Sequence, residues 1–136
     1  MEVVKSFLTD TVSLARYLED KLPCTASEVF SLAEKGEATI LVPQIVLGEF
    51  IYIAIRGRLR LSDPKVAVKQ VIDELMGTSF IFPSNFPEHG WDIFLNLDIP
   101  ELHDRLIAAE ALSRSLSLIS NNPVFLKVNG LDVIWD

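Results

Sequence analysis

Three carboxylates, Asp10, Glu49 and Asp104, stand at positions where folding alone does not explain an acid. Asp10 follows an apolar run, Glu49 is the only charge in an apolar stretch from residue 43 to 55, and Asp104 precedes an alanine-rich segment. Charged side chains are rarely buried unless they are paired or bind a metal. Carboxylates from distant parts of a chain commonly hold a divalent cation together. The sequence therefore predicts a metal-dependent enzyme.

Such an acidic cluster suits the chemistry of phosphate esters. Clustered carboxylates repel one another, and a bound cation relieves this repulsion. Mg²⁺ is commonly held by one or two carboxylates together with waters and substrate phosphates. It activates a water and neutralises charge that develops on a phosphodiester.

Each acid also has a structural explanation. Asp10 could cap the helix that follows it, and Asp104 could be favoured by its place near a helix N-terminus. Glu49 is harder to explain in this way, because Arg56 lies two turns away, too far for a local ion pair. The three acids are more telling together than singly.

Strands that alternate with helices must position these acids. Apolar and β-branched runs predict strands at residues 3–8, 39–42, 79–82, 116–120 and 133–135. Helical spacing of apolar residues predicts helices at residues 12–21, 25–34, 44–56, 64–75, 91–97 and 102–116. This alternation indicates an α/β sandwich with a mostly parallel sheet. Sites in such sheets form beyond the C-terminal ends of the strands, where Asp10 and residues 120–122 stand.

Two further predictions concern helices. The helix at 44–56 is apolar nearly all round, so we expect it to be buried on more than one side, within the domain or in an oligomer. Asp98, with Glu101 three residues later, is predicted to cap the helix that carries Asp104.

Composition limits the class of protein. A chain of 136 residues with 49% hydrophobic residues fits one domain, spanning residues 1–136. Cys24 is the only cysteine, which excludes an internal disulfide or a cysteine-based zinc site. The longest apolar stretch, residues 45–55, contains Glu49 and is too short to span a bilayer. The N-terminus does not resemble a secretory signal, so we expect a cytoplasmic protein with no membrane association.

Charge is distributed unevenly. The net charge of −7 argues against a broad basic surface for nucleic acid, although acids of the site contribute to it. Arg56, Arg58 and Arg60 alternate along one segment. They are either a solvated helix end or a rim that steers phosphates toward the acids.

Four segments agree in order and spacing with a known family. They are Thr9-Asp10-Thr11, Val42-Pro43-Gln44-Ile45-Val46-Leu47-Gly48-Glu49-Phe50, Ile99-Pro100-Glu101-Leu102-His103-Asp104-Arg105-Leu106-Ile107-Ala108-Ala109 and Leu118-Ile119-Ser120-Asn121-Asn122. In these the chain resembles the PIN-domain family, and within it the VapC-like toxins of toxin–antitoxin pairs. The most specific piece is the segment at residues 103–109.

The resemblance implies a three-layer α/β/α sandwich with a five-stranded, mostly parallel sheet. It also implies ribonuclease activity that depends on Mg²⁺ or Mn²⁺, a cognate antitoxin that blocks the site, and a homodimer or higher homo-oligomer. Asp10, Asp104 and Glu49 would be the catalytic and metal-binding residues. Substrate or outer-shell roles would fall to Thr11, Ser120, Asn122, Arg56, Arg58 and Arg60. His103 is common in the family but is not its usual catalyst, so we expect it to be structural.

One departure from the family bears on activity. Many members carry an aspartate near the end of the fourth strand, where this chain has Asn121 and Asn122. Asn122 is the better equivalent, and an amide brings no charge to the site. The main alternative is therefore a weakly active or inactive PIN domain that acts as an RNA-binding or protein-interaction module. A DNA-directed nuclease is a third hypothesis.

Overall fold

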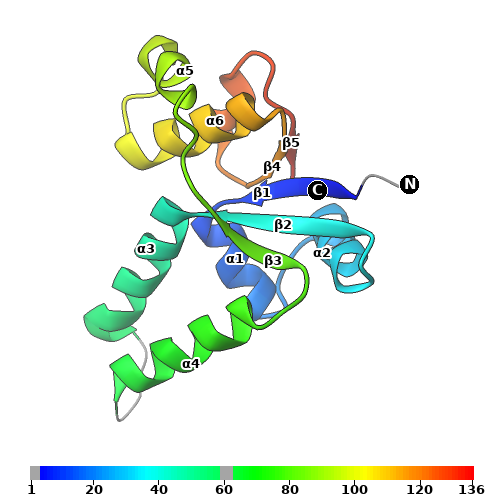
Figure 1. Ribbon diagram of the computed structural model, residues 1–136, viewed down its shortest axis with the longest axis vertical. Helices are drawn as coiled ribbons and strands as arrows, with labels where there is room; N and C mark the ends of the chain where they lie inside the picture. The colour runs from blue at the N-terminus through cyan, green and yellow to red at the C-terminus, as the bar shows by residue number, and fades with distance from the viewer. Residues whose placement is uncertain (1–3, 59–62) are drawn as a thin grey trace.

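A parallel sheet of five strands organises the computed structural model, which describes residues 4–58 and 63–136. The strands lie in the order β3-β2-β1-β4-β5, and every neighbouring pair is parallel (Figure 1). Their bounds are β1 Lys5–Thr9, β2 Ala38–Pro43, β3 Ile81–Ser84, β4 Ser117–Ile119 and β5 Val133–Ile134. The α/β sandwich predicted from the sequence is confirmed, and the sheet is entirely parallel.

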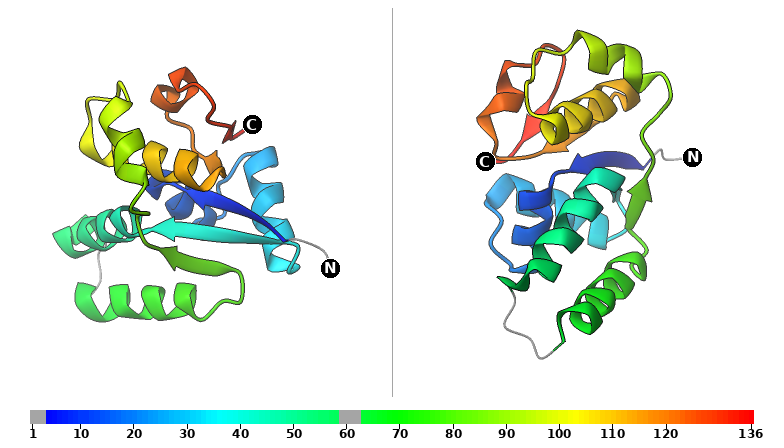
Figure 2. Two further views of the ribbon diagram at one scale, coloured as in Figure 1. Left: turned by 45° about the horizontal axis from the view of Figure 1, so that its top comes forward. Right: turned by 90° about the vertical axis from the view of Figure 1, so that its left-hand side faces the viewer.

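Helices cover the sheet on both faces. They are α1 Thr11–Leu18, α2 Cys24–Glu34, α3 Gln44–Ile53, α4 Pro64–Met76, α5 Gly90–Asn96 and α6 Leu102–Arg114, with a π-helical turn at Ala54–Arg58 and a 3₁₀ turn at Pro123–Lys127. Figure 2 shows α5 and α6 on one side of the sheet and α1 to α4 toward the other. Crossovers between parallel strands are right-handed, so the face changes where the strand order reverses.

The inner strands are apolar because helices cover both of their faces. In β1, Phe7 pairs with Ile40 of β2, and Leu8 pairs with Leu41. Phe7, Leu8 and Ile40 are almost fully buried. This pairing anchors the strand ends beyond which the acids lie.

The two edges of the sheet differ from its centre. β3 contains Pro83, which pairs in register with Val42 of β2, and β5 has only two residues. A proline cannot donate a ladder hydrogen bond, which suits it to an edge strand. Both outer strands are therefore poor templates for a further strand.

The helix that carries Glu49 differs from the sequence prediction. The sequence predicts one helix at residues 44–56, whereas α3 ends at Ile53 and a π-helical turn follows. Val46 is the one fully buried residue of α3, while Tyr52 and Ile53 are 60% and 51% exposed. Burial on several sides is thus not reached within a single chain, and the apolar side chains of α3 remain available to a partner.

Two other expectations concern caps and membranes. Asp63 caps α4, and α6 is capped by Glu101 rather than by Asp98. Helix α6 begins at Leu102, so Asp98 lies too far upstream to reach its free N–H groups. Within the part of the chain that the structure describes, no helix combines the length and apolarity needed to cross a bilayer.

Phe125 tests how the C-terminal segment holds this core. It is 1% exposed, whereas its neighbour Leu126 is 73% exposed. We expect Phe125→Ala to lower the free energy of unfolding by about 3–5 kcal/mol, because it leaves a cavity in the core. Leu126→Ala should change it by less than about 0.5 kcal/mol. Urea unfolding of both variants measures the difference, and equal effects would contradict this account of the core.

Candidate active site

An acidic pocket lies at the point where the strand order reverses. β1 stands between β2 and β4, so the connections leaving β1 and β4 run to opposite faces and open a crevice beyond the strand ends. A pocket of about 280 Å³ occupies this crevice. It is lined by Asp10, Thr11, Val12, Glu49, Asp104, Ile107, Asn121, Asn122 and Pro123. The structure therefore brings together the three acids that the sequence singles out.

Asp10 is both a helix cap and a wall of the pocket. Its Oδ1 accepts a hydrogen bond of 2.9 Å from the backbone N–H of Ser13, which caps α1. Its Oδ2 accepts a short hydrogen bond from the Ser120 hydroxyl at the end of β4. The side chain is 6% exposed. Each carboxylate oxygen has two lone pairs, so these bonds leave Asp10 able to accept further ones.

Glu49 approaches the pocket from α3. Its Oε1 accepts a long hydrogen bond of 3.4 Å from the Thr11 hydroxyl at the start of α1. Burial raises the pKa of the Glu49 carboxyl, and the negative charges of Glu101 and Asp104 raise it further, against the opposing effects of His103 and Thr11. The ionised carboxylate is therefore held in surroundings that disfavour its charge.

Asp104 lies in the first turn of α6. Its backbone N–H donates a 2.7 Å hydrogen bond to Glu101 Oε2, and its Oδ2 accepts one of 3.3 Å from the Asn122 amide. Burial raises the pKa of the Asp104 carboxyl, followed by the charge of Glu101, and Asp10 also raises it. Repulsion among the acids is thus expressed in the pKa of two of them.

Asn122 stabilises this arrangement as a neutral donor. Its side-chain Oδ1 accepts from the backbone N–H of Val124, and its backbone N–H donates to the Ser120 hydroxyl oxygen. The Val124 bond takes the amide oxygen, so the amide N–H₂ faces Asp104. A continuous chain of hydrogen bonds therefore runs from Asp104 through Asn122 and Ser120 to Asp10.

The acids line one pocket without forming a ready-made cage. Across residues 4–58 and 63–136, no three Asp, Glu, His or Cys side chains gather closely enough to hold a metal ion as they stand. Of the three arginines, Arg56 has a described side chain, and it is not among the described residues that line the pocket. Arg56 is exposed beyond the end of α3 and lies over the Tyr52 ring, 5.3 Å from its centroid. Arg60 and the side chain of Arg58 lie outside the part of the chain that is described.

Sequence reasoning missed the charge of Glu101 at this site. Glu101 caps α6 and its Oε1 lies 2.9 Å from Nδ1 of His103, so both residues lie beside the acids. The available signal was its position three residues before Asp104, which was interpreted only as part of a cap headed by Asp98. Glu101 thus adds a negative charge close to Asp104, although Asn122 adds none.

Solved structures share this fold over nearly the whole chain. VapBC2 from Rickettsia felis, bound to a DNA fragment from its promoter, matches with a TM-score of 0.76 at 21% identity, covering 96% of this chain and 99% of that one. DNA-bound VapBC from Salmonella typhimurium matches with a TM-score of 0.69 at 21% identity, covering 97% of this chain and 98% of that one. A third match is VapC20 from Mycobacterium tuberculosis, a Sarcin-Ricin loop cleaving toxin. Its TM-score is 0.52 at 14% identity, and the match covers 93% of this chain and 98% of that one. No curated protein sequence matches the chain significantly.

The parallel sheet and the acidic pocket at its switch point define a class of α/β domain. A comparison of the sequence with family models identifies the family within this class. The model of the PIN domain family matches residues 8–131. The chain belongs to the PIN domain family, as the resemblance of its four segments predicts.

The raised pKa of Glu49 gives a test of the site's electrostatics without any metal. A pKa raised by folding means that the neutral form favours the fold, so this contribution is lost as pH rises through the folded pKa. Glu49→Gln should therefore raise the melting temperature at pH 7 by a small amount, on the order of 1–2 °C, because Glu49 is only partly buried. The difference should vanish near pH 4, where wild-type Glu49 is protonated. Thermal melts in chelator measure it, with the exposed Glu37→Gln as a control that should show no change.

Proposed function

We propose that this protein is a metal-dependent endoribonuclease that hydrolyses RNA phosphodiester bonds, and that it is the toxin of a toxin–antitoxin pair. One observation carries the proposal: the carboxylate that follows β1 and those on α3 and α6 line a single pocket at the switch point of a PIN fold. Three of the similar structures support it, since two are VapBC complexes and the third is a Sarcin-Ricin loop cleaving toxin.

The donor set suits a hard divalent cation such as Mg²⁺ or Mn²⁺. Every donor that Asp10, Glu49 and Asp104 offer is a carboxylate oxygen, which Mg²⁺ prefers. Burial raises the pKa of both Glu49 and Asp104, and neighbouring acids add to this effect. A cation with its waters would offset the charge of these acids without requiring a closed protein cage. Asp10 and Asp104 would hold the cation directly or through water.

The remaining roles follow from position. When bound, the cation lowers the pKa of a coordinated water and stabilises charge on the phosphate. Glu49 orients the attacking water and accepts its proton, a role that a raised pKa favours. Thr11 positions Glu49, and Ser120 positions Asp10 through its hydroxyl. Arg56, Arg58 and Arg60 are candidates for contacts with the RNA backbone farther from the cleaved bond.

Asn122 sets the strength of the site in this proposal. Its amide holds Asp104 by donating a hydrogen bond, where many family members would supply another carboxylate. The pocket therefore favours one cation, and a second would bind more weakly. This observation also motivates the alternative of a PIN domain that binds RNA or protein with little cleavage. Metal titration separates the two, because that alternative retains RNA or partner binding without measurable affinity for Mg²⁺ or Mn²⁺.

Substitution of the metal-holding acids tests the proposed activity. We expect Asp10→Asn and Asp104→Asn each to reduce Mg²⁺-dependent RNA cleavage at least about a hundredfold, because each removes charge from the cation site. Asparagine can still cap α1 and accept from Asn122, so the fold should persist. Cleavage rates with Mg²⁺, Mn²⁺ and chelator measure the effect, and circular dichroism checks the fold. Asp98→Asn is the matched control, and full activity in both acid variants would sink the assignment.

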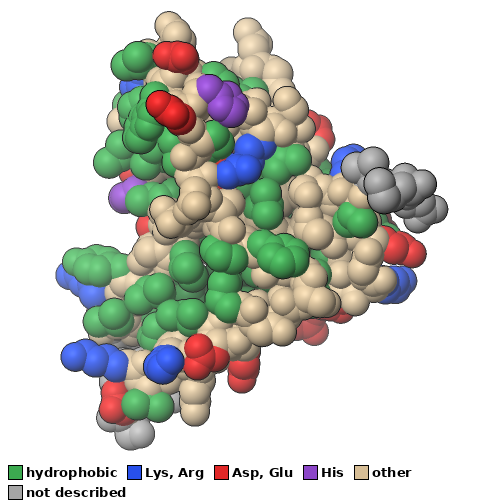
Figure 3. Space-filling model, viewed as in Figure 1, with side chains coloured by type: hydrophobic (Ala, Val, Ile, Leu, Met, Phe, Trp, Pro, Cys, Tyr) green, Lys and Arg blue, Asp and Glu red, His purple; other side chains and the backbone are tan. Residues whose placement is uncertain are grey.

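An apolar groove next to the acidic pocket supports an antitoxin partner. It has a volume of about 530 Å³ and lies between α1, α3 and α4. Phe50, Ile53, Leu18 and Val71 contribute apolar walls, and Thr11 lines both this groove and the acidic pocket. A partner segment in the groove would therefore end beside the acids. Figure 3 shows apolar side chains gathered over this region.

A matched pair of isoleucines tests this groove. Ile53 lines it and is 51% exposed, whereas Ile55 is 46% exposed but is not among the lining residues. We expect Ile53→Asp to weaken binding of the protein encoded next to this gene at least about tenfold, because it places a charge in an apolar contact. Ile55→Asp should have a much smaller effect, and both should retain cleavage. Titration calorimetry measures the affinities, and equal losses would place the partner elsewhere.

A further inference from the structure

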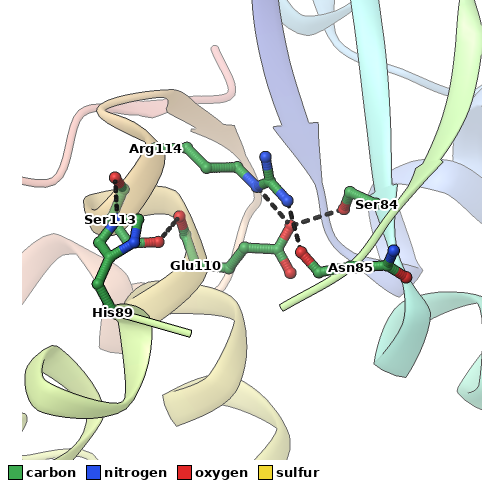
Figure 4. A network of polar contacts seen from close by, with 6 residues as sticks. All are labelled: Ser84, Asn85, His89, Glu110, Ser113 and Arg114. Atoms are coloured by element: carbon green, nitrogen blue, oxygen red, sulfur yellow. Dashed lines mark hydrogen bonds and ion pairs between the residues drawn. The ribbon is translucent and has the colours of Figure 1, made fainter. Parts of the chain in front are cut away.

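A buried carboxylate outside the acidic pocket has an unused oxygen. Glu110 on α6 is 2% exposed. Its Oε2 accepts a 2.6 Å hydrogen bond from the Ser84 hydroxyl and a 3.1 Å bond from Arg114 Nε, as Figure 4 shows. Among the described residues, Oε1 has no hydrogen-bond partner. Oε1 is not fully enclosed, and Glu110 is among the residues that line a neighbouring pocket.

The network fixes the orientation of this carboxylate. Arg114 also donates to the backbone carbonyl of Asn85, and a ring nitrogen of His89 lies 3.1 Å from the carbonyl of Ser113 (Figure 4). These bonds join the segment after β3 to α6. Ser84 and Arg114 are both donors to Oε2, so rotation of the carboxyl group would break them. Oε1 is therefore a fixed acceptor.

The pocket beside Glu110 has aromatic and apolar walls. It has a volume of about 330 Å³ and is lined by Gln44, Ile45, Phe86, Trp91, Leu106 and Glu110. The rings of Phe86 and Trp91 lie 4.4 Å apart, and Trp91 is 50% exposed. A Cβ on Gly90 would lie 2.8 Å from the Phe86 ring, so glycine permits this close approach. The pocket thus offers two aromatic rings, tilted by 47° to one another, next to the Glu110 acceptor and the Gln44 amide.

The two pockets share two helices. Helix α3 contributes Gln44 and Ile45 to this pocket and Glu49 to the acidic one. Helix α6 contributes Glu110 here and Asp104 there, about 9 Å apart along the axis. A nucleotide next to the one whose phosphate occupies the acidic pocket would extend along these helices toward Glu110.

We propose that this second pocket binds an unpaired nucleobase that carries an exocyclic amino group, which makes it a specificity site of the proposed nuclease. Unpaired bases stack on aromatic side chains and are read by hydrogen bonds at their edges. Adenine, cytosine and guanine each present an amino N–H to a carboxylate oxygen. Uracil presents its one N–H between two carbonyl oxygens, which a carboxylate repels. The inference rests on the proposed function but concerns different residues.

Replacing one carboxylate oxygen of Glu110 by an amide nitrogen tests the inference. In Glu110→Gln the donors Ser84 and Arg114 require the amide oxygen at the place of Oε2, so the amide N–H₂ replaces Oε1. The wild type should cleave short RNAs with cytosine at one flanking position about tenfold faster than the same RNAs with uracil there. Glu110→Gln should abolish or reverse this preference, with unchanged metal dependence. The exposed Glu88→Gln is the matched control.

Nucleotide binding keeps this test independent of cleavage. Without metal, CMP should bind Asp10→Asn protein more tightly than UMP in titration calorimetry, and Trp91→Phe should retain the preference, which Glu110→Gln removes. Absence of RNA cleavage together with this CMP preference would sink the nuclease but support the pocket. An unchanged base preference in Glu110→Gln would overturn the inference. The inference would also be overturned if the wild type bound no nucleotide and Trp91→Ala lost self-association. The pocket would then be a contact between two copies.

Discussion

The hydrogen bonds of one carboxylate hold together the edge of the sheet where the acidic pocket lies. Asp10 joins the start of α1 to the end of β4, because its two oxygens accept from Ser13 and Ser120. The Ser13 hydroxyl and the Asp10 N–H both donate to the carbonyl of Ile119, which adds two further ties at the same place. A charge so well satisfied can be buried at the switch point of the sheet without destabilising it. The other two acids are placed against this fixed reference by α3 and α6.

Glu49 and Asp104 differ from Asp10 in how they are satisfied. Each accepts one long side-chain hydrogen bond, from Thr11 and Asn122, and each has a raised pKa. Keeping two partly desolvated acids beside a third therefore lowers the free energy of unfolding. Such local conflicts concentrate at functional sites, where they are compensated by the rest of the fold. Asn122 moderates the conflict by replacing a further negative charge with a donor.

The sequence was sufficient for the fold and for the acids, but not for the details that connect them. Alternating strands and helices predicted the parallel sheet, because apolar residues gather in Phe7-Leu8 of β1 and Ile40-Leu41-Val42 of β2. The helix containing Glu49 was predicted too long, since its periodicity gives no sign of the π-helical turn at Ala54. The cap was assigned to Asp98 because local spacing could not show where α6 begins. Glu110 was passed over, although it is the one charge between Arg105 and Arg114, because only tertiary contacts show that one of its oxygens is bound.

The construction of the sheet edges has a consequence for how copies of this chain can associate. Pro83 interrupts the donor row of β3, and β5 offers a ladder of only two residues. Neither edge is suited to adding a strand from another molecule, which is the route by which parallel sheets grow into fibrils. The apolar side chains of α3 can thus stay exposed with less danger of cross-β aggregation. Any association of copies would rely on helix-on-helix contacts, which can form and separate without remodelling the sheet.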